Sequence, residues 1–204
     1  MLRKARIAVF VSGGGTNLEA LLQAQESGAI PHGEIVLVCA SSAKAYALVR
    51  AENHGVPAVT VARKGMTQDA FEEALNAHLK EHQIDFIILA GFLSILSENF
   101  VKQWPNKIIN IHPSLIPSFC GEGLYGLKVH EAALEKGVKV TGATVHFVNE
   151  IPDGGEILLQ KAVSIMPDDT AEVLQRRVME QAEWILLPEA AEMIAQRLLE
   201  NNER

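Results

Sequence analysis

Residues 6–27, RIAVFVSGGGTNLEALLQAQES, determine how the rest of the chain is interpreted. The run 6–12 is apolar and rich in β-branched residues, as buried strands are, whereas 17–27 carries leucine and alanine at helical spacing. The glycine-rich stretch 12–17 joins them, and Gly28 follows the helix, at a position where glycine commonly ends helices. Strand, turn and helix in this order form the first half of a βαβ unit, which predicts a parallel sheet.

The same alternation continues through the first two thirds of the chain. Apolar runs recur, separated by amphipathic stretches, and Phe71, Leu75 and Leu79 fall on one face of such a helix. We therefore expect an α/β fold with a mostly parallel sheet and helices on both faces. The further strands are expected at 34–40, 57–62, 85–90 and 107–111, and the further helices at 43–53, 67–82, 96–104 and 128–136.

The last third of the chain has a different pattern. TGATVHFVNE (141–150) and GEILLQKAVSI (155–165) are strand-like runs separated by IPDGG, which predicts an antiparallel strand pair at the C-terminal side of the sheet. Asp169 and Glu172 match the D-x-x-E pattern that caps a helix start, and Pro188 should kink or restart that helix. We expect a single domain, residues 1–204.

Composition limits the classes of partner. The 204 residues are 48% hydrophobic and 21% charged, which suits one domain with a full core. A net charge of -7 and the lack of a Lys/Arg cluster argue against nucleic-acid binding. Cys39 and Cys120 form no CxxC pair, and Cys39 is expected in the core. The apolar run 86–97 is too short to span a bilayer, and the start is not a signal peptide, so we expect a cytoplasmic protein with no membrane partner; the oligomeric state stays open.

The turn SGGGTN (12–17) is the first candidate binding site. Glycines between a strand and a helix allow unusual backbone conformations, and the N–H groups at a helix N-terminus bind anions. The turn lacks the Gly-Lys-Ser/Thr of a P-loop and the third glycine of a dinucleotide fingerprint, so a single phosphate is the expected ligand. The alternative is a structural turn in which Thr16 or Asn17 caps the helix.

The second candidate site is KIINIHPSLIP (107–117). In a strand, Asn110 and His112 lie on one face, and the prolines that follow should end the strand at His112, where α/β sheets bind ligands. A carboxamide that stabilises negative charge and an imidazole that carries protons suit acyl transfer. The alternative is a structural histidine. Ser114 lacks the G-x-S-x-G surroundings of a hydrolase nucleophile.

Asp153, in IPDGG, is a candidate partner for His112. A carboxylate beside the imidazole would support acid–base chemistry, and the two glycines that follow allow close approach of the chain. The alternative is an ordinary turn aspartate, because spacing alone does not bring residues 112 and 153 together. The other histidines form no HExxH or similar ligand pair, so no metal site is predicted; His130 and His146 are expected to be buried or to support the site.

Several stretches together resemble the phosphoribosylglycinamide formyltransferases, folate-dependent enzymes of purine synthesis. N-x-H-P-S-L-[LI]-P followed by V-H-F-V and D-G-G is specific for the formyltransferase fold, and the likeness runs nearly from end to end. The resemblance implies a Rossmann-like sheet and transfer of a formyl group from 10-formyltetrahydrofolate to the amine of glycinamide ribonucleotide through a tetrahedral intermediate. The stretches are SGGGTN (12–17), LAGFLSILS (89–97), NIHPSLIPSF (110–119), GATVHFVNEIPDGGEILLQ (142–160) and the C-terminal helix.

The resemblance also implies roles for individual residues. The family's catalytic trio matches Asn110, His112 and Asp153. Its substrate-binding positions, the phosphate turn and a ribose-contacting glutamate, match Gly15, Thr16, Asn17 and Glu183. Its folate-binding positions match Leu93, Ser94, Ile95, Leu96 and Asn110. Ser94 replaces an arginine associated with the family, and the loop 118–126, with Cys120, is longer than in the commonest members.

Three other functions share part of this pattern. Methionyl-tRNA formyltransferase shares the HPSLLP region but has a second domain for tRNA, for which neither the length nor the acidic charge is suited. Formyltetrahydrofolate deformylase uses water as acceptor and normally carries an N-terminal regulatory domain. A non-enzymatic nucleotide-binding module would need only the glycine turn, and the presence of the whole trio argues against it.

Overall fold

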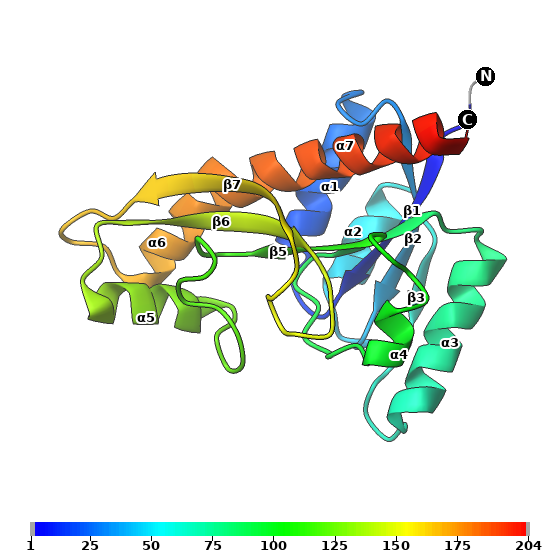
Figure 1. Ribbon diagram of the computed structural model, residues 1–204, viewed down its shortest axis with the longest axis horizontal. Helices are drawn as coiled ribbons and strands as arrows, with labels where there is room; N and C mark the ends of the chain where they lie inside the picture. The colour runs from blue at the N-terminus through cyan, green and yellow to red at the C-terminus, as the bar shows by residue number, and fades with distance from the viewer. Residues whose placement is uncertain (1–2, 203–204) are drawn as a thin grey trace.

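The computed structural model describes residues 3–202, which form a seven-stranded sheet with the strand order β3-β2-β1-β4-β5-β6-β7 (Figure 1). The first five strands in chain order pair in parallel, whereas β6 is antiparallel to both β5 and β7. The predicted sheet, mostly parallel with an antiparallel C-terminal pair, is confirmed. The strands are β1 Ala5–Val11, β2 Gly33–Ala40, β3 Ala58–Thr60, β4 Phe86–Leu89, β5 Ile108–His112, β6 Val140–Phe147 and β7 Ile157–Ser164.

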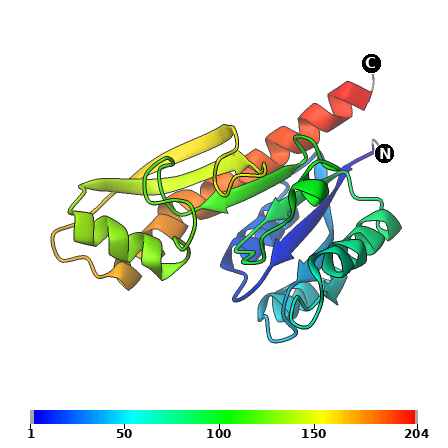
Figure 2. The ribbon, with the colours of Figure 1, turned by 60° about the horizontal axis from the view of Figure 1, so that its bottom comes forward.

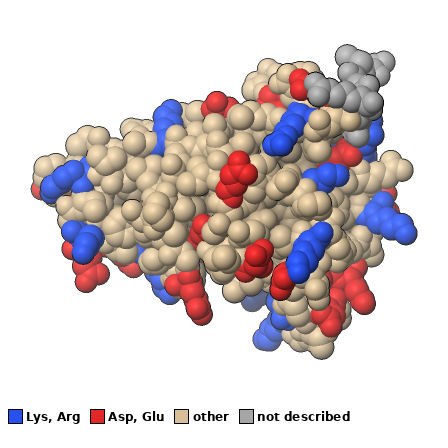
Figure 3. Space-filling view, in the orientation of Figure 1, with Lys and Arg blue, Asp and Glu red and all other residues tan. Residues whose placement is uncertain are grey.

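Helices cover both faces of the sheet. Helices α1, α2 and α7 pack on one face and α3 and α4 on the other, and Figures 1 and 2 show α7 as a long helix that lies along the sheet. On the face drawn in Figure 3, acidic and basic side chains are interspersed without a continuous basic patch. The helices are α1 Thr16–Glu26, α2 Ala47–Asn53, α3 Gln68–Glu81, α4 Glu98–Val101, α5 Leu127–Lys136, α6 Ala171–Val178, the π-helical turn η1 Met179–Glu183, and α7 Trp184–Asn202.

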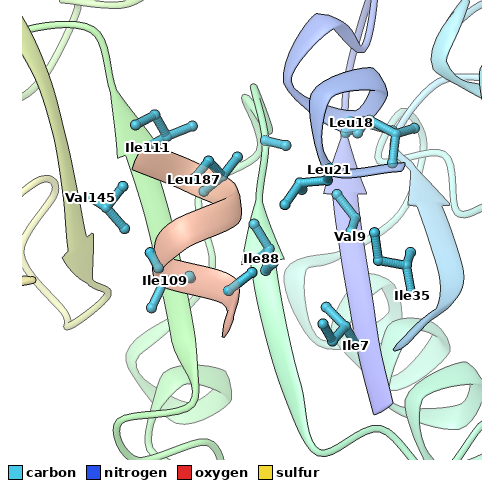
Figure 4. Close-up of a cluster of buried hydrophobic side chains, with 14 of the residues drawn as sticks. Ile7, Val9, Leu18, Leu21, Ile35, Ile88, Ile109, Ile111, Val145 and Leu187 are labelled. Carbon is cyan, nitrogen blue, oxygen red and sulfur yellow. The ribbon is translucent and has the colours of Figure 1, made fainter. Parts of the chain in front are cut away.

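Strand β1 shows why the sequences of the predicted strands are almost continuously apolar. Ile7 and Val9 point to the face covered by α1, where they belong to the buried cluster in Figure 4. Phe10 points to the opposite face and packs with Phe71 of α3 in a second cluster. Because both faces of the strand are buried from Ile7 to Val11, these positions favour apolar side chains, and each large one contributes roughly 1.5–3 kcal/mol.

Several predicted boundaries differ from the structure. The helix expected at 43–53 begins only at Ala47, and the strand expected at 57–62 is the shorter β3. The helix expected at 96–104 is only α4, whose start is capped by Ser97, which accepts from the N–H of Phe100 at 3.2 Å. The helix expected to be capped by Asp169 is instead capped by Thr170, whose hydroxyl accepts from the N–H of Val173 at 3.3 Å. The D-x-x-E interpretation was therefore wrong.

The carboxylate of Asp169 has a different role. It forms an ion pair with Arg177, and Arg177 Nη2 donates to Asp169 Oδ1 at 2.5 Å. Pro188 is the fifth residue of α7, so the bond that it cannot donate is the first within that helix. The π-helical turn η1 directly precedes α7, which is the restart that the proline predicted.

The topology gathers the predicted site segments at one edge of the sheet. Strands β1, β4 and β5 are neighbours, and their carboxyl ends lead into residues 12–17, 90–97 and 113–126. The chain proceeds from β1 outward to β3 on one side, and from β4 outward to β5 on the other. The boundary between β1 and β4 is therefore the topological switch point, where open α/β sheets bind ligands.

Candidate active site

A cavity of about 520 Å³ lies at this edge. The loop between β6 and β7, residues 148–153, lines one part of it, and residues 91–96 and 121–126 line others. Leu93 and Ile95 are 62% and 73% exposed, unusually high fractions for large apolar side chains. A cavity of this size, with apolar walls and a few polar groups, suits an organic ligand.

Asn110 lies on β5, opposite His146 of β6 in the antiparallel register. The ring Nδ1 of His146 lies 2.8 Å from the carbonyl of Phe147, which can only accept, so Nδ1 carries the proton. The other ring nitrogen, Nε2, then accepts from Asn110 Nδ2 at 3.2 Å. This contact fixes the orientation of the Asn110 amide in the cavity wall and uses only one of its two hydrogens.

His112, the last residue of β5, has a fixed tautomer for a similar reason. Its Nε2 lies 2.9 Å from the carbonyl of Phe119 and donates to it. In the neutral ring, Nδ1 is therefore the basic nitrogen, and it faces Asp153 Oδ2 at 3.5 Å. A proton accepted at Nδ1 would form an ion pair with this carboxylate.

Asp153 has left-handed backbone, with a φ of 54°. Its Oδ2 accepts from the N–H of Gly121 at 2.9 Å, and its Oδ1 lies 3.5 Å from His146 Nε2. Burial raises the pKa of Asp153, but a hydrogen bond from the protonated form of His146, the Gly121 N–H and the charge of His112 together lower it below its ordinary value. Asp153 is therefore ionised at neutral pH and lies beside His112, as the sequence hypothesis requires; its catalytic role stays a prediction.

The glycine turn differs in detail from the prediction. Of its three glycines only Gly15 has a positive φ, 73°, and it is the N-cap of α1 without a side-chain cap. The alternative in which Thr16 or Asn17 caps this helix is therefore wrong. The carbonyls of Gly13 and Gly14 accept from Ala47 N and Arg50 Nε. Within residues 3–202 the N–H groups of positions 13–17 have no acceptor, so they are available to an anion.

Asn17 joins the glycine turn to the C-terminal region. Its Nδ2 donates to Glu183 Oε2 at 2.7 Å, across 166 positions of sequence. Glu183 is buried in the π-helical turn, and burial raises its pKa to about 7 against the opposing effect of the Asn17 bond. Thr16 Oγ1 contacts Met179 Sδ of the same turn at 3.7 Å. The structure thus brings together the four residues that the resemblance assigns to the nucleotide.

Ser12 connects this region with the cavity. Its hydroxyl oxygen accepts from the N–H of Leu93 at 2.8 Å and lies 2.7 Å from Ser41 Oγ. The glycine turn and the cavity-lining residues are therefore in direct contact. Sequence reasoning did not identify Ser12, and it left His146 open, although the pairing of VHFV with NIH in an antiparallel register is the signal that places His146 beside Asn110.

Other candidates have structural roles or none in this site. Ser114 is buried and donates to the carbonyl of Ser118 at 2.5 Å. Cys39 is buried in the core, where burial raises its pKa to about 12. Among residues 3–202, no three His, Cys, Asp or Glu side chains are grouped so as to hold a metal ion. In the same range, no helix combines the length and apolarity needed to cross a bilayer.

A cavity at the switch point, with a carboxamide, an imidazole and a carboxylate in its wall, suits the transfer of an acyl group. The formyl transferase family model matches residues 5–190, and the chain belongs to this family.

Similar proteins with known names indicate a particular branch of this family. The phosphoribosylglycinamide formyltransferase of Haemophilus influenzae is 41% identical over 86% of this chain and 81% of its own length. The crystal structure of glycinamide ribonucleotide transformylase 1 from Symbiobacterium toebii has a TM-score of 0.88 at 40% identity, covering 95% of this chain and 88% of that one. The trifunctional purine biosynthetic protein adenosine-3 of Bos taurus is 43% identical over 95% of this chain, which spans only 18% of that relative. The resemblance to phosphoribosylglycinamide formyltransferases predicted from the sequence is confirmed.

Proposed function

We propose that the chain transfers the formyl group of 10-formyltetrahydrofolate to the amine of glycinamide ribonucleotide, a step of de novo purine biosynthesis carried out in the cytoplasm. The observation that carries this proposal is the convergence of Asn110, His112 and Asp153 in the wall of one cavity. The names of the relatives support the same reaction.

The formyl donor is assigned to the cavity. Residues 93–96 line the cavity outside the helices and strands, and Leu93, Ile95 and Leu96 supply apolar side chains that a flat heterocycle can pack against. Tyr125 and Ile151, 49% and 59% exposed, extend the apolar wall on the other side. These surfaces fit the ring system of a folate.

The nucleotide is assigned to the glycine turn and Glu183. The N–H groups of Gly15, Thr16 and Asn17, at the N-terminus of α1, fit a phosphate. The buried carboxyl of Glu183 beside Asn17 fits the hydroxyl groups of a ribose, which can donate to it. The contact between Ser12 and Leu93 supports this assignment, because a nucleotide bound at the glycine turn would lie next to the cavity, where its amine could approach the formyl carbon.

The three polar side chains divide the chemistry. As the amine attacks, negative charge develops on the formyl oxygen, and the free amide hydrogen of Asn110 is available to stabilise it. His112 accepts a proton at Nδ1 and Asp153 stabilises the resulting charge. When the carbon–nitrogen bond to the folate breaks, the same proton can return to the folate nitrogen, which leaves a formylated amine and a neutral imidazole.

The decisive experiment follows both products with purified protein. With both substrates present, we expect formylated glycinamide ribonucleotide and tetrahydrofolate in equal amounts. Formate released at the same rate with or without the nucleotide would instead identify a deformylase. Binding of the nucleotide without either product would leave only a binding module.

A further inference from the structure

Residues 90–97 shape the cavity without regular secondary structure of their own. They lie between the end of β4 and the start of α4, and they form neither helix nor ladder. The exposed side chains of Leu93 and Ile95 belong to this stretch. Its conformation therefore depends on contacts made from other elements.

Glu72 of α3 provides the strongest of these contacts. Its side chain is buried, although it does not line the cavity. Its carboxylate accepts from the N–H of Ser97 at 2.6 Å, from the hydroxyl of Ser97 at 2.5 Å, and from Gln68 Nε2 at 2.5 Å. Hydrogen bonds to a buried, ionised carboxylate are strong. Loss of this carboxylate would leave its donors without an acceptor, so Glu72 attaches Ser97 firmly to α3.

Gln68 carries the attachment further into the stretch. Its Nε2 also donates to the carbonyl of Ile95 at 3.0 Å, and its Oε1 accepts from Arg63 Nη2 at 3.0 Å. Arg63 Nη1 in turn donates to the carbonyl of Met66 at 2.5 Å, which fixes the guanidinium against the chain before α3. A continuous series of hydrogen bonds thus runs from Arg63 through Gln68 to the backbone of the cavity wall.

Apolar packing fixes the same stretch at its other end. The ring of Phe92 lies between two aromatic rings, with centroids 5.2 Å from that of Phe10 and 6.4 Å from that of Phe71. Phe71 precedes Glu72 on α3, so one turn of this helix holds both the apolar and the polar anchor. The cavity wall is therefore attached to α3 as well as to the sheet.

We propose that Glu72 is a positioning residue for the formyl donor, acting through Ser97 and Gln68 to hold residues 91–97 in the shape that binds the folate. The proposal rests on the proposed function for the identity of the ligand, but the attachment itself does not. It predicts that weakening the hydrogen bonds of Glu72 impairs binding of the folate. Binding of the nucleotide should be retained, because the glycine turn receives no contact from Glu72.

Glu72→Gln is the direct test. Glutamine keeps the size of the side chain but replaces one acceptor oxygen by an NH₂ group, which would face a donor of Ser97 or Gln68. We expect the KM for 10-formyltetrahydrofolate to rise about tenfold and the KM for the nucleotide to change less than about twofold. The matched control is Glu73→Gln, because Glu73 is the exposed neighbour on the same helix.

Hydrogen exchange supplies a readout that does not depend on activity. In Glu72→Gln, the amides of residues 91–97 should exchange faster than in the parent, while those of α1 and β1 keep their rates. Gln68→Ala, which removes the bond to Ile95 from a half-buried position, should give a smaller effect of the same kind and serves if Glu72→Gln does not fold.

The outcomes separate the two proposals. Equal rises in both KM values, or unchanged exchange at residues 91–97 in both variants, would overturn the positioning role. If the parent protein forms no formylated nucleotide while exchange at 91–97 accelerates in Glu72→Gln, the attachment is supported and the proposed function fails.

Discussion

Asp153 Oδ2 lies 3.5 Å from His112 Nδ1, and the same short stretch of loop contacts both side chains. The carbonyl of Phe119 accepts from the His112 ring, and the N–H of Gly121 donates to Asp153. The distance is longer than a direct hydrogen bond, but it is short enough for a charge interaction once the ring is protonated. The loop that contains residues 119–121 therefore sets the separation of the proposed acid–base pair.

Replacing Asp153 by Asn tests the acid–base role. Asn tolerates the left-handed backbone at this position, and its carbonyl oxygen can still accept from Gly121, so the fold should be retained. Loss of the charge should lower kcat by at least about 10²-fold. Steady-state kinetics beside thermal unfolding would show this, with Asp168→Asn at an exposed position as control. Near-parent kcat would leave Asp153 as a turn residue only.

Asn110→Ala tests stabilisation of the formyl oxygen. Removing one such donor typically lowers kcat by about 10²- to 10³-fold, roughly 3 to 4 kcal/mol. The variant should stay folded, because Asn110 is only half-buried and its one side-chain bond is to His146. Single-turnover kinetics with both substrates bound would measure the loss, against Asn53→Ala on the surface of α2. Retention of more than half of the parent turnover would exclude the role.

Gly15→Val tests the phosphate turn. A side chain at Gly15 must adopt a φ of 73°, and its Cβ would lie 2.7 Å from that of Ala47. The KM for the nucleotide should rise far more than that for the folate. Gly28→Val is the matched control at the other end of α1, because its φ of 79° imposes similar strain with no atom within 4 Å of the added Cβ. Comparable changes in both KM values would rule the assignment out.

Glu183 should make the protein less stable as pH rises. Burial raises its pKa from 4.5 to about 7, so between these values the folded state binds the proton that the unfolded state has lost. Stability falls through this window by about 3 kcal/mol at most. Glu183→Gln removes that loss, so its free energy of unfolding should exceed the parent's at pH 8 but not at pH 4, while the KM for the nucleotide rises.

His130 should make the protein more stable as pH rises, which is opposite to the effect of Glu183, over nearly the same pH range. Burial, with a smaller effect from the charge of His112, lowers its pKa from 6.5 to about 4, so the unfolded state binds the extra proton in this window. Stability therefore rises with pH by about 3 kcal/mol at most. Urea titrations from pH 4 to 8 measure the free energy of unfolding of each variant. In His130→Leu this free energy should fall with pH because of Glu183, and in Glu183→Gln it should rise with pH because of His130. If the free energy of unfolding changed with pH in the same way in both variants, the opposite effects assigned to Glu183 and His130 would be contradicted.

Local patterns were enough to predict most of the fold. A parallel strand buried on both faces needs an apolar residue at nearly every position, so 6–12 and 85–90 were readable as strands without knowledge of their neighbours. The end of β5 at His112 followed from Pro113, which lacks the N–H that a ladder needs. The sequence did not determine the cap of α6, because Asp169 and Thr170 both have capping side chains, and in the structure Asp169 is held instead by Arg177 and by the N–H of Met166.

The candidate site, like the fold, could be predicted only in part from local sequence. Local sequence was enough to put Asn110 and His112 on one strand face and a glycine turn before α1, because these features depend on residues close together in the chain. The folded structure was needed to show that Glu183 contacts Asn17, that Asp153 lies beside His112 and His146, and that Glu72 holds Ser97. Such contacts depend on strand order, register and helix packing, which bring distant residues together through many weak interactions that no local pattern encodes.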